Sequence, residues 1–165
     1  MTNSQILNRL IKKKVIAYGF LKEDELLTKS YETPFHFFHH FWKQYEKSRE
    51  KFKKINLTLS KVLDQSFRSI NGSAFETIIG FLLIREKINI ISMDEHVENV
   101  KLVKPDFIIN SKISNFFLSL KTSVRERWKQ ADYEALKYKI VYPKSKCILI
   151  VNNEKDSLHI RGKIN

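Results

Sequence analysis

The sequence predicts an α/β fold in which a mixed, mostly antiparallel β-sheet is flanked by helices and preceded by a helical N-terminal region. Up to Ile70, apolar residues recur at three- and four-residue spacing, as they do on one face of a helix. From residue 88 onward, short β-prone runs follow, and a long helical segment precedes the last apolar run. A length of 165 residues suits one domain. We therefore expect a single domain, with residues 1–70 as its helical part and residues 71–165 as its core.

The N-terminal region is predicted to contain several helices. Ile6, Leu10 and Val15 have the spacing of one apolar helical stripe. Residues 35–54 are rich in aromatic side chains and then in basic ones, and residues 57–67 repeat an apolar helical pattern. Each of these segments is expected to bury one face against its neighbours.

A helix boundary is predicted near the middle of the chain. Asn71-Gly72 is a dipeptide typical of turns, so we expect a helix to end there and Ser73 to begin the next one, over residues 74–87. Ser73 and Glu76 also have the spacing of a capping box, in which both side chains satisfy the first backbone N–H groups.

The second half of the chain predicts the sheet. We expect β-strands at residues 88–92, 102–103, 106–109, 116–121, 147–151 and 158–161, with a helix over residues 123–142. The run at 147–151 is almost wholly apolar, which indicates a buried central strand. The segment at 158–161 is expected to be a short edge strand.

Charge indicates a polyanionic partner. Thirty Lys and Arg residues against eighteen Asp and Glu residues give a net charge of +12, and binding to phosphates releases condensed counterions. Nucleic acid is the favoured partner, although a lipid surface or simple solubility also fits the charge alone. The longest apolar run is too short to cross a membrane, and no signal peptide is expected. The lone Cys147 predicts no disulfide and favours a cytoplasmic location.

An aspartate and a lysine are predicted to meet at one end of the sheet. Asp106 begins one expected strand and Lys121 ends the next, with enough residues between them for a turn and return. An aspartate that holds Mg²⁺ and a lysine that orients water suit phosphodiester hydrolysis. Exposed strand-end residues with no catalytic role are the other interpretation of this spacing.

The pair belongs to a longer pattern. Pro105-Asp106 followed by Ser119-Leu120-Lys121 resembles the signature of the PD-(D/E)xK nuclease superfamily. This resemblance implies a restriction-endonuclease-like core and Mg²⁺ as the cofactor. The pattern departs from the family at Ser119, where the family has an acidic metal ligand.

One branch of that superfamily places the missing acid elsewhere. In type II restriction endonucleases that cut CCGG, CCNGG or CCWGG sites, a glutamate thirteen residues after the lysine replaces it, and Glu134 stands at this interval from Lys121. Helical spacing puts Glu134 on the same stripe as Ala131 and Tyr138, which must pack on the sheet. A carboxylate there is costly without a partner, and a metal ion is one such partner.

The same branch carries an Arg-acid-Arg cluster, and Arg125-Glu126-Arg127 matches it here. Arginine donates two hydrogen bonds to guanine and glutamate accepts one from cytosine, so the cluster suits the recognition of G·C pairs. Ser123 and Glu126 also form a capping box by sequence, so Glu126 has a purely structural interpretation as well.

Together, the resemblance implies a Mg²⁺-dependent type II restriction endonuclease acting on double-stranded DNA at CC/GG half-sites. Asp106 and Glu134 would hold the metal, Lys121 would activate water, and Glu76 would be an accessory acid or only a helix cap. Palindromic sites imply a homodimer or two monomers that act in sequence, and the homodimer is the favoured form. Two alternatives stay open: a structure-specific repair or resolvase nuclease of the same superfamily, and a catalytically inactive DNA-binding module in which Ser119 marks lost chemistry.

Overall fold

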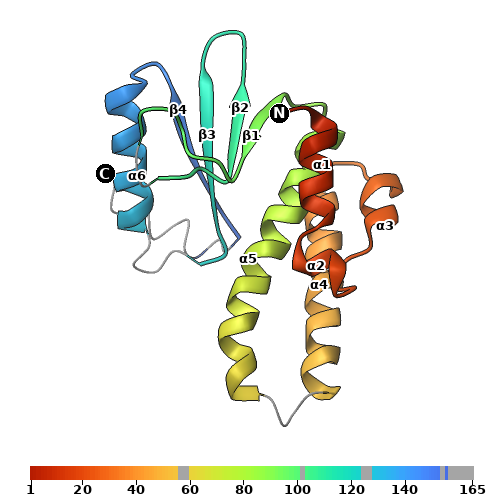
Figure 1. Cartoon of the computed structure of the whole chain (residues 1–165). Helices are drawn as coiled ribbons and strands as arrows, with labels where there is room; N and C mark the ends of the chain where they lie inside the picture. The colour runs from red at the N-terminus through yellow and green to blue at the C-terminus, as the bar shows by residue number, and fades with distance from the viewer. Residues whose placement is uncertain (56–59, 101–102, 124–127, 153–154, 156–165) are drawn as a thin grey trace. The chain divides into compact units, whose positions relative to one another are not determined.

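The computed structural model describes residues 1–55, 60–100, 103–123, 128–152 and 155, and the chain divides into two compact units (Figure 1). The helical unit comprises Asn3–Ile88, and the sheet unit comprises Met1–Thr2 with Asn89–Asn165. The change from helical to sheet structure therefore falls at residue 88, where the sequence predicts the first β-prone run. The division into a helical part over residues 1–70 and a core over residues 71–165 stays a prediction. The single-domain organisation stays a prediction.

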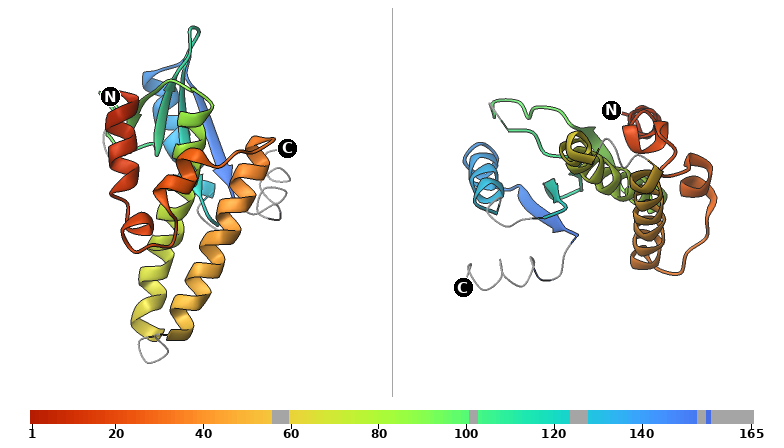
Figure 2. Two further views of the ribbon diagram at one scale, coloured as in Figure 1. Left: turned by 90° about the vertical axis from the view of Figure 1, so that its right-hand side faces the viewer. Right: turned by 90° about the horizontal axis from the view of Figure 1, so that it is seen from below.

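The helical unit is built around one long helix. Its elements are α1 (Asn3–Ile11), α2 (Lys14–Ala17), α3 (Glu23–Thr28), α4 (Pro34–Ile55) and α5 (Ser60–Arg85). Helix α5 contacts each of the other four. Helices α4 and α5 lie side by side and run in opposite directions (Figures 1 and 2). The predicted N-terminal stripe is confirmed, because Ile6, Leu10 and Val15 are completely buried.

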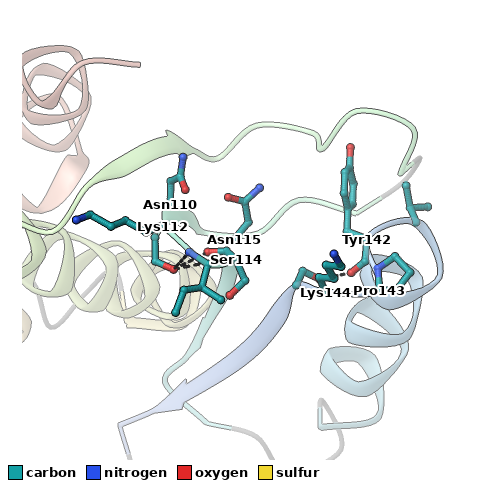
Figure 3. Close-up of a pocket in the computed structure, with 11 residues that line it drawn as sticks. Asn110, Lys112, Ser114, Asn115, Tyr142, Pro143 and Lys144 are labelled. Atoms are coloured by element: carbon teal, nitrogen blue, oxygen red, sulfur yellow. Dashed lines mark hydrogen bonds between the residues drawn. The ribbon is translucent and has the colours of Figure 1, made fainter.

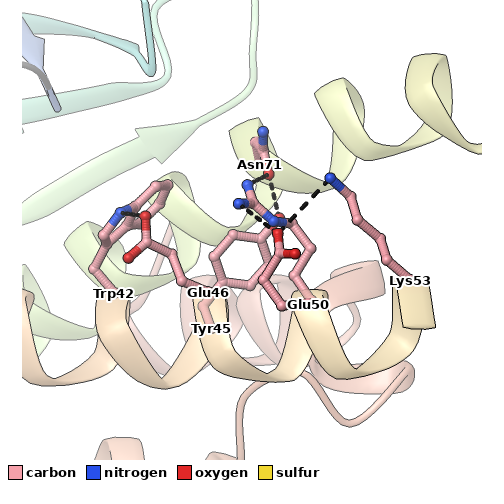
Figure 4. A network of polar contacts seen from close by, with 7 residues as sticks. Trp42, Tyr45, Glu46, Glu50, Lys53 and Asn71 are labelled. Carbon is pink, nitrogen blue, oxygen red and sulfur yellow. Dashed lines mark hydrogen bonds and ion pairs between the residues drawn. The ribbon is translucent and has the colours of Figure 1, made fainter. Parts of the chain in front are cut away.

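Helix α5 runs straight through the dipeptide that was expected to form a turn. Asn71 and Gly72 lie in its interior, so the predicted boundary and the capping role of Ser73 are wrong. Tertiary contacts explain the difference: Oδ1 of Asn71 accepts hydrogen bonds from the Tyr45 hydroxyl and, at 3.1 Å, from Nη1 of Arg49, both on α4 (Figure 4). Since the Tyr45 side chain is fully buried, this bond satisfies a hydroxyl that has no access to water.

Gly72 is a position where a larger residue should stabilise the fold. A Cβ atom there would meet no heavy atom within 4 Å, and glycine inside a helix lowers stability by loss of chain entropy. We expect Gly72→Ala to raise the free energy of unfolding by about 0.5–1 kcal/mol, measured by urea denaturation. Gly19→Ala is the matched control: Gly19 has a φ of +71°, so alanine there should be destabilising. A loss of stability in Gly72→Ala would contradict the continuous helix.

The sheet unit contains four described strands and one helix. They are β1 (Ile90–Met93), β2 (Phe107–Asn110), β3 (Asn115–Lys121), α6 (Trp128–Val141) and β4 (Lys146–Val151). The strand order is β1-β2-β3-β4, with antiparallel pairs β1–β2 and β2–β3 and a parallel pair β3–β4. The predicted mixed, mostly antiparallel sheet is thus confirmed. Helix α6 forms the crossover connection that the parallel pair requires.

One face of this sheet is covered by α6. The ring of Tyr138 stacks on that of Phe117 at a centroid distance of 4.4 Å and an interplanar angle of 25°. Buried residues from the strands, the connecting segment and the helix form one apolar cluster, which consists of Val100, Val103, Ile108, Phe117 and Tyr138. The thiol of Cys147 lies against the same helix and donates to the carbonyl oxygen of Ala135 at 3.7 Å.

Three strand predictions either differ from the structure or lie outside the described residues. The predicted burial of the strand at 147–151 is wrong, because β4 ends the described strand order and Ile148 is 40% exposed. Val103 is buried but belongs to no strand. The strand expected at 158–161 lies outside the described residues. Among the helices that the structure describes, none combines the length and apolar character needed to cross a membrane.

Candidate active site

Antiparallel pairing of β2 and β3 brings Asp106 close to the end of β3. Asp106 immediately precedes β2, and Lys121 is the last residue of β3. The Asp106 carboxylate accepts a hydrogen bond from the backbone N–H of Leu120, and the Asp106 N–H donates to the carbonyl oxygen of Leu118 at 2.9 Å. The structure therefore pairs the two strands and places Asp106 and Lys121 at the same end of them. That the two side chains act together stays a prediction.

Asp106 and Lys121 belong to the face of the sheet that α6 covers. Side chains of a strand alternate between faces, so Ser119 and Lys121 lie on the same face as Phe117, which stacks against Tyr138. Ile108 is paired with Phe117 and shares that face, and Asp106 lies two residues before it. The face under α6 therefore changes from an apolar core to polar side chains toward this end of the sheet.

Helix α6 places Glu134 at the level of Ser119. Because α6 connects two parallel strands, it runs in the opposite direction to β3. Glu134 precedes Tyr138 by one helical turn, an axial distance of about 6 Å. Ser119 follows Phe117 by two strand positions, an axial distance of about 7 Å. Glu134 thus approaches the sheet where this chain has Ser119 in place of the acid of the signature.

The carboxylate of Glu134 is only partly satisfied. Its Oε1 accepts a hydrogen bond from Nε2 of Gln130 at 2.9 Å, whereas its Oε2 is buried and has no hydrogen-bond partner within the described part of the chain. Burial raises the pKa of the Tyr138 phenol above its usual value, and the carboxylates of Glu134 and Asp106 raise it further. Both carboxylates are therefore within electrostatic range of the same buried hydroxyl.

Asp94 is a further acidic residue at this site, and sequence reasoning missed it. It follows the last residue of β1, and its N–H donates to the carbonyl oxygen of Asp106 at 3.2 Å. A carboxylate oxygen of Asp94 lies within 4.8 Å of one of Asp106. The β1–β2 register pairs Met93 with Phe107, so the next positions outward are these two aspartates. The strand boundary at Met93 is the signal that would have identified Asp94.

The other predicted site residues belong to the helical unit or lie outside the described residues. Glu76 belongs to the helical unit, where its Oε2 accepts from Nζ of Lys13 at 2.7 Å. It does not cap a helix, because α5 begins at Ser60. Its role as an accessory acid stays a prediction. The predicted DNA-reading residues Arg125, Glu126 and Arg127 lie outside the described residues.

An open pocket occupies the opposite end of β2 and β3. It lies between the β2–β3 turn and the segment that follows α6, and Tyr142, Pro143 and Lys144 line its second side (Figure 3). Asn110 ends β2 and Asn115 begins β3 at this pocket, whereas Asp106 and the end of β3 lie at the other end of the strands. The pocket is therefore separate from the acidic site.

Two solved structures resemble the chain. Restriction endonuclease PspGI, in a complex with substrate DNA, matches with a TM-score of 0.60 and 21% identity, over 98% of this chain and 73% of PspGI. Ecl18kI, a restriction endonuclease solved metal-depleted with uncleaved, modified DNA, matches with a TM-score of 0.54 and 16% identity, over 100% of this chain and 67% of Ecl18kI. The sequence matches no protein-family model and no curated protein. The chain has the α/β fold of restriction endonucleases, as the resemblance implied.

Proposed function

We propose that this chain is a Mg²⁺-dependent type II restriction endonuclease that hydrolyses phosphodiester bonds in double-stranded DNA. The observation that carries the proposal is the position of Asp106, Lys121 and Glu134. Asp106 and Lys121 lie at one end of β2 and β3, and Glu134 lies on the helix that covers the same face of the sheet, in a fold shared with two restriction endonucleases. A lysine beside carboxylates at a sheet end is the arrangement that metal-assisted phosphodiester hydrolysis needs.

The acidic residues fit a divalent cation. Mg²⁺ prefers carboxylate oxygens, and Oε2 of Glu134 is a buried acceptor without a hydrogen-bond partner among the described residues. Asp94 and Asp106 have carboxylate oxygens within 4.8 Å of each other, and a cation offsets the repulsion of two such charges. Asp106 and Glu134 would hold the ion, with Asp94 beside them. A bound Mg²⁺ supplies charge neutralisation at the phosphoryl oxygens and acidifies a coordinated water.

Lys121 would orient the attacking water and stabilise the charge that develops on the phosphate. Its ammonium group donates up to three hydrogen bonds, and a fixed positive charge at a partly enclosed site stabilises a developing oxyanion. Lys121 is half-buried at the end of β3. Pairing with Val151 of β4 fixes its backbone. Asp106 is held similarly through its hydrogen bond with Leu120.

DNA binding is supported by charge. The net charge of +12 favours a phosphate backbone, and PspGI and Ecl18kI were both solved with DNA. Arg125, Glu126 and Arg127 are proposed to contact the bases of a CC/GG half-site, since arginine recognises guanine and glutamate recognises cytosine. A palindromic site implies a homodimer with one half-site for each subunit.

Asp94 is expected to tune the metal requirement. Asp94→Asn removes one negative charge beside Asp106 and should raise the Mg²⁺ concentration for half-maximal cleavage by about 10-fold, the scale of an outer-sphere ligand. A Mg²⁺ titration of the initial cleavage rate measures this value. Glu98→Gln, at an exposed position between β1 and β2, is the charge-matched control. Equal Mg²⁺ dependence of both variants and the wild type would show that Asp94 does not contribute to metal binding.

Digestion of a long, unmethylated bacteriophage DNA tests the proposal, with Mg²⁺ or with EDTA. Discrete fragments with Mg²⁺ only are expected, and sequencing of their ends should give CC/GG half-sites. A smear that is unchanged in Arg125→Ala and Arg127→Ala would instead indicate a structure-specific nuclease. Intact DNA that is retarded on a gel would indicate a DNA-binding module without catalysis.

A further inference from the structure

Two buried polar atoms on α6 lack the partners that burial requires. The side chain of Tyr138 is 1% exposed, and its hydroxyl makes no hydrogen bond to any described residue. One helical turn earlier, Oε2 of Glu134 is also buried and unpaired within the same described part. The first atom is a donor and the second an acceptor. A buried polar group without a partner destabilises a protein, so each atom calls for a functional explanation.

Packing alone does not require the hydroxyl of Tyr138. Its ring stacks on Phe117 at 4.4 Å, and a phenylalanine ring would make the same contact. Burial raises the pKa of the phenol, and the nearby carboxylates of Glu134 and Asp106 raise it further, so the hydroxyl keeps its proton and remains a donor. It lies within electrostatic reach of both acids of the candidate site.

We propose that Tyr138 is a positioning residue, whose hydroxyl donates a hydrogen bond to the Glu134 carboxylate when a divalent cation binds there and so fixes the orientation of that carboxylate. The inference rests on the proposed function, in which Glu134 is a metal ligand. With Gln130 on Oε1 and Tyr138 on Oε2, both carboxylate oxygens would be held by donors, and each would keep a lone pair for the ion. Donors behind a ligand commonly set its orientation and affinity for the metal.

Mn²⁺ binding to the full chain tests this inference without DNA. The free Mn²⁺ signal in electron paramagnetic resonance gives the dissociation constant. We expect Tyr138→Phe to weaken Mn²⁺ binding by about 10- to 100-fold. Its melting temperature without metal should equal or exceed that of the wild type, because the substitution removes a buried unpaired group and keeps the ring. Unchanged Mn²⁺ affinity would overturn the inference.

Tyr142→Phe, at the residue that follows the end of α6, is the matched control. The Tyr142 ring also contacts Phe117, at 5.9 Å, but its hydroxyl donates to the carbonyl oxygen of Glu98 at 2.9 Å. This variant should keep the wild-type Mn²⁺ affinity and lose some thermal stability. Equal loss of Mn²⁺ affinity in Tyr142→Phe and Tyr138→Phe would mean that the effect is not specific to the hydroxyl of Tyr138, and would overturn the inference.

A double variant separates positioning from an independent effect. If Tyr138 acts through Glu134, then Tyr138→Phe combined with Glu134→Gln should bind Mn²⁺ no more weakly than Glu134→Gln alone. Fully additive losses would overturn this mechanism, and so would a wild-type chain that binds no Mn²⁺. Mn²⁺ binding that weakens in Tyr138→Phe upholds the inference even if no DNA is cut, and the failure then belongs to the proposed nuclease activity.

Discussion

Lys121→Ala should reduce the rate of Mg²⁺-dependent DNA cleavage by about 100- to 1,000-fold, the usual effect of removing one group that stabilises developing charge. The side chain lies on the sheet face that α6 covers, at the end of β3 near Asp106. Because alanine leaves the strand pairing intact, the fold and the affinity for DNA should change little. Quenched single-turnover cleavage, together with a gel-shift titration, separates the rate from binding.

Lys112→Ala is the matched control for Lys121→Ala. It removes the same charge from an exposed residue in the β2–β3 turn, at the other end of the same two strands. This variant should cut DNA at nearly the wild-type rate, with only a small loss of affinity from the lost charge. Equal rates in the two variants would mean that Lys121 contributes only net charge.

Glu134→Gln is expected to have the largest effect, a loss of about 1,000-fold in cleavage rate, which corresponds to about 4 kcal/mol of transition-state stabilisation. Glutamine keeps the size of the side chain and can still bond to Gln130, but it lacks the negative charge that a Mg²⁺ ligand needs at this position. Single-turnover rates over a range of Mg²⁺ concentrations measure the loss. Asp132→Asn, at an exposed position on the same helix, should behave as the wild type.

Placing a carboxylate on β3 tests whether Glu134 acts at the position of Ser119. Because Glu134 lies at the level of Ser119, Ser119→Asp should restore part of the cleavage rate when it is added to Glu134→Gln. The same substitution in the wild type should not increase the rate, since two acids would then repel each other at one site. Failure of Ser119→Asp to restore any activity would contradict the shared position of the two side chains.

The helical and strand patterns were sufficient to predict most of the fold. Alternation along residues 116–121 and the apolar spacing of the first helices are local properties, and both were confirmed. The turn expected at Asn71 failed because its side chain is used by Tyr45 and Arg49, which a local pattern does not reveal. Helix α5 shows how a tertiary hydrogen bond overrides a turn-forming dipeptide.

The site was predictable where residues lie on adjacent strands or at a fixed interval. The positions of Asp106 and Lys121 at one end of β2 and β3 followed from strand alternation, and the proposed role of Glu134 followed from its distance to the lysine together with the resemblance. Asp94 was missed because its position depends on where β1 ends and on the β1–β2 register, which no motif encodes. The ion pair of Glu76 with Lys13 joins residues far apart in the sequence, so only the folded structure identifies it.

The measurement that tests the central claim most directly is the single-turnover cleavage of unmethylated duplex DNA by the full chain, with and without Mg²⁺, for the wild type, Glu134→Gln and Asp132→Asn. We predict Mg²⁺-dependent cleavage by the wild type and Asp132→Asn and almost none by Glu134→Gln. Cleavage that persists in Glu134→Gln, or uncut DNA with the wild type at every Mg²⁺ concentration, would contradict a metal-dependent nuclease site built on Asp106, Lys121 and Glu134.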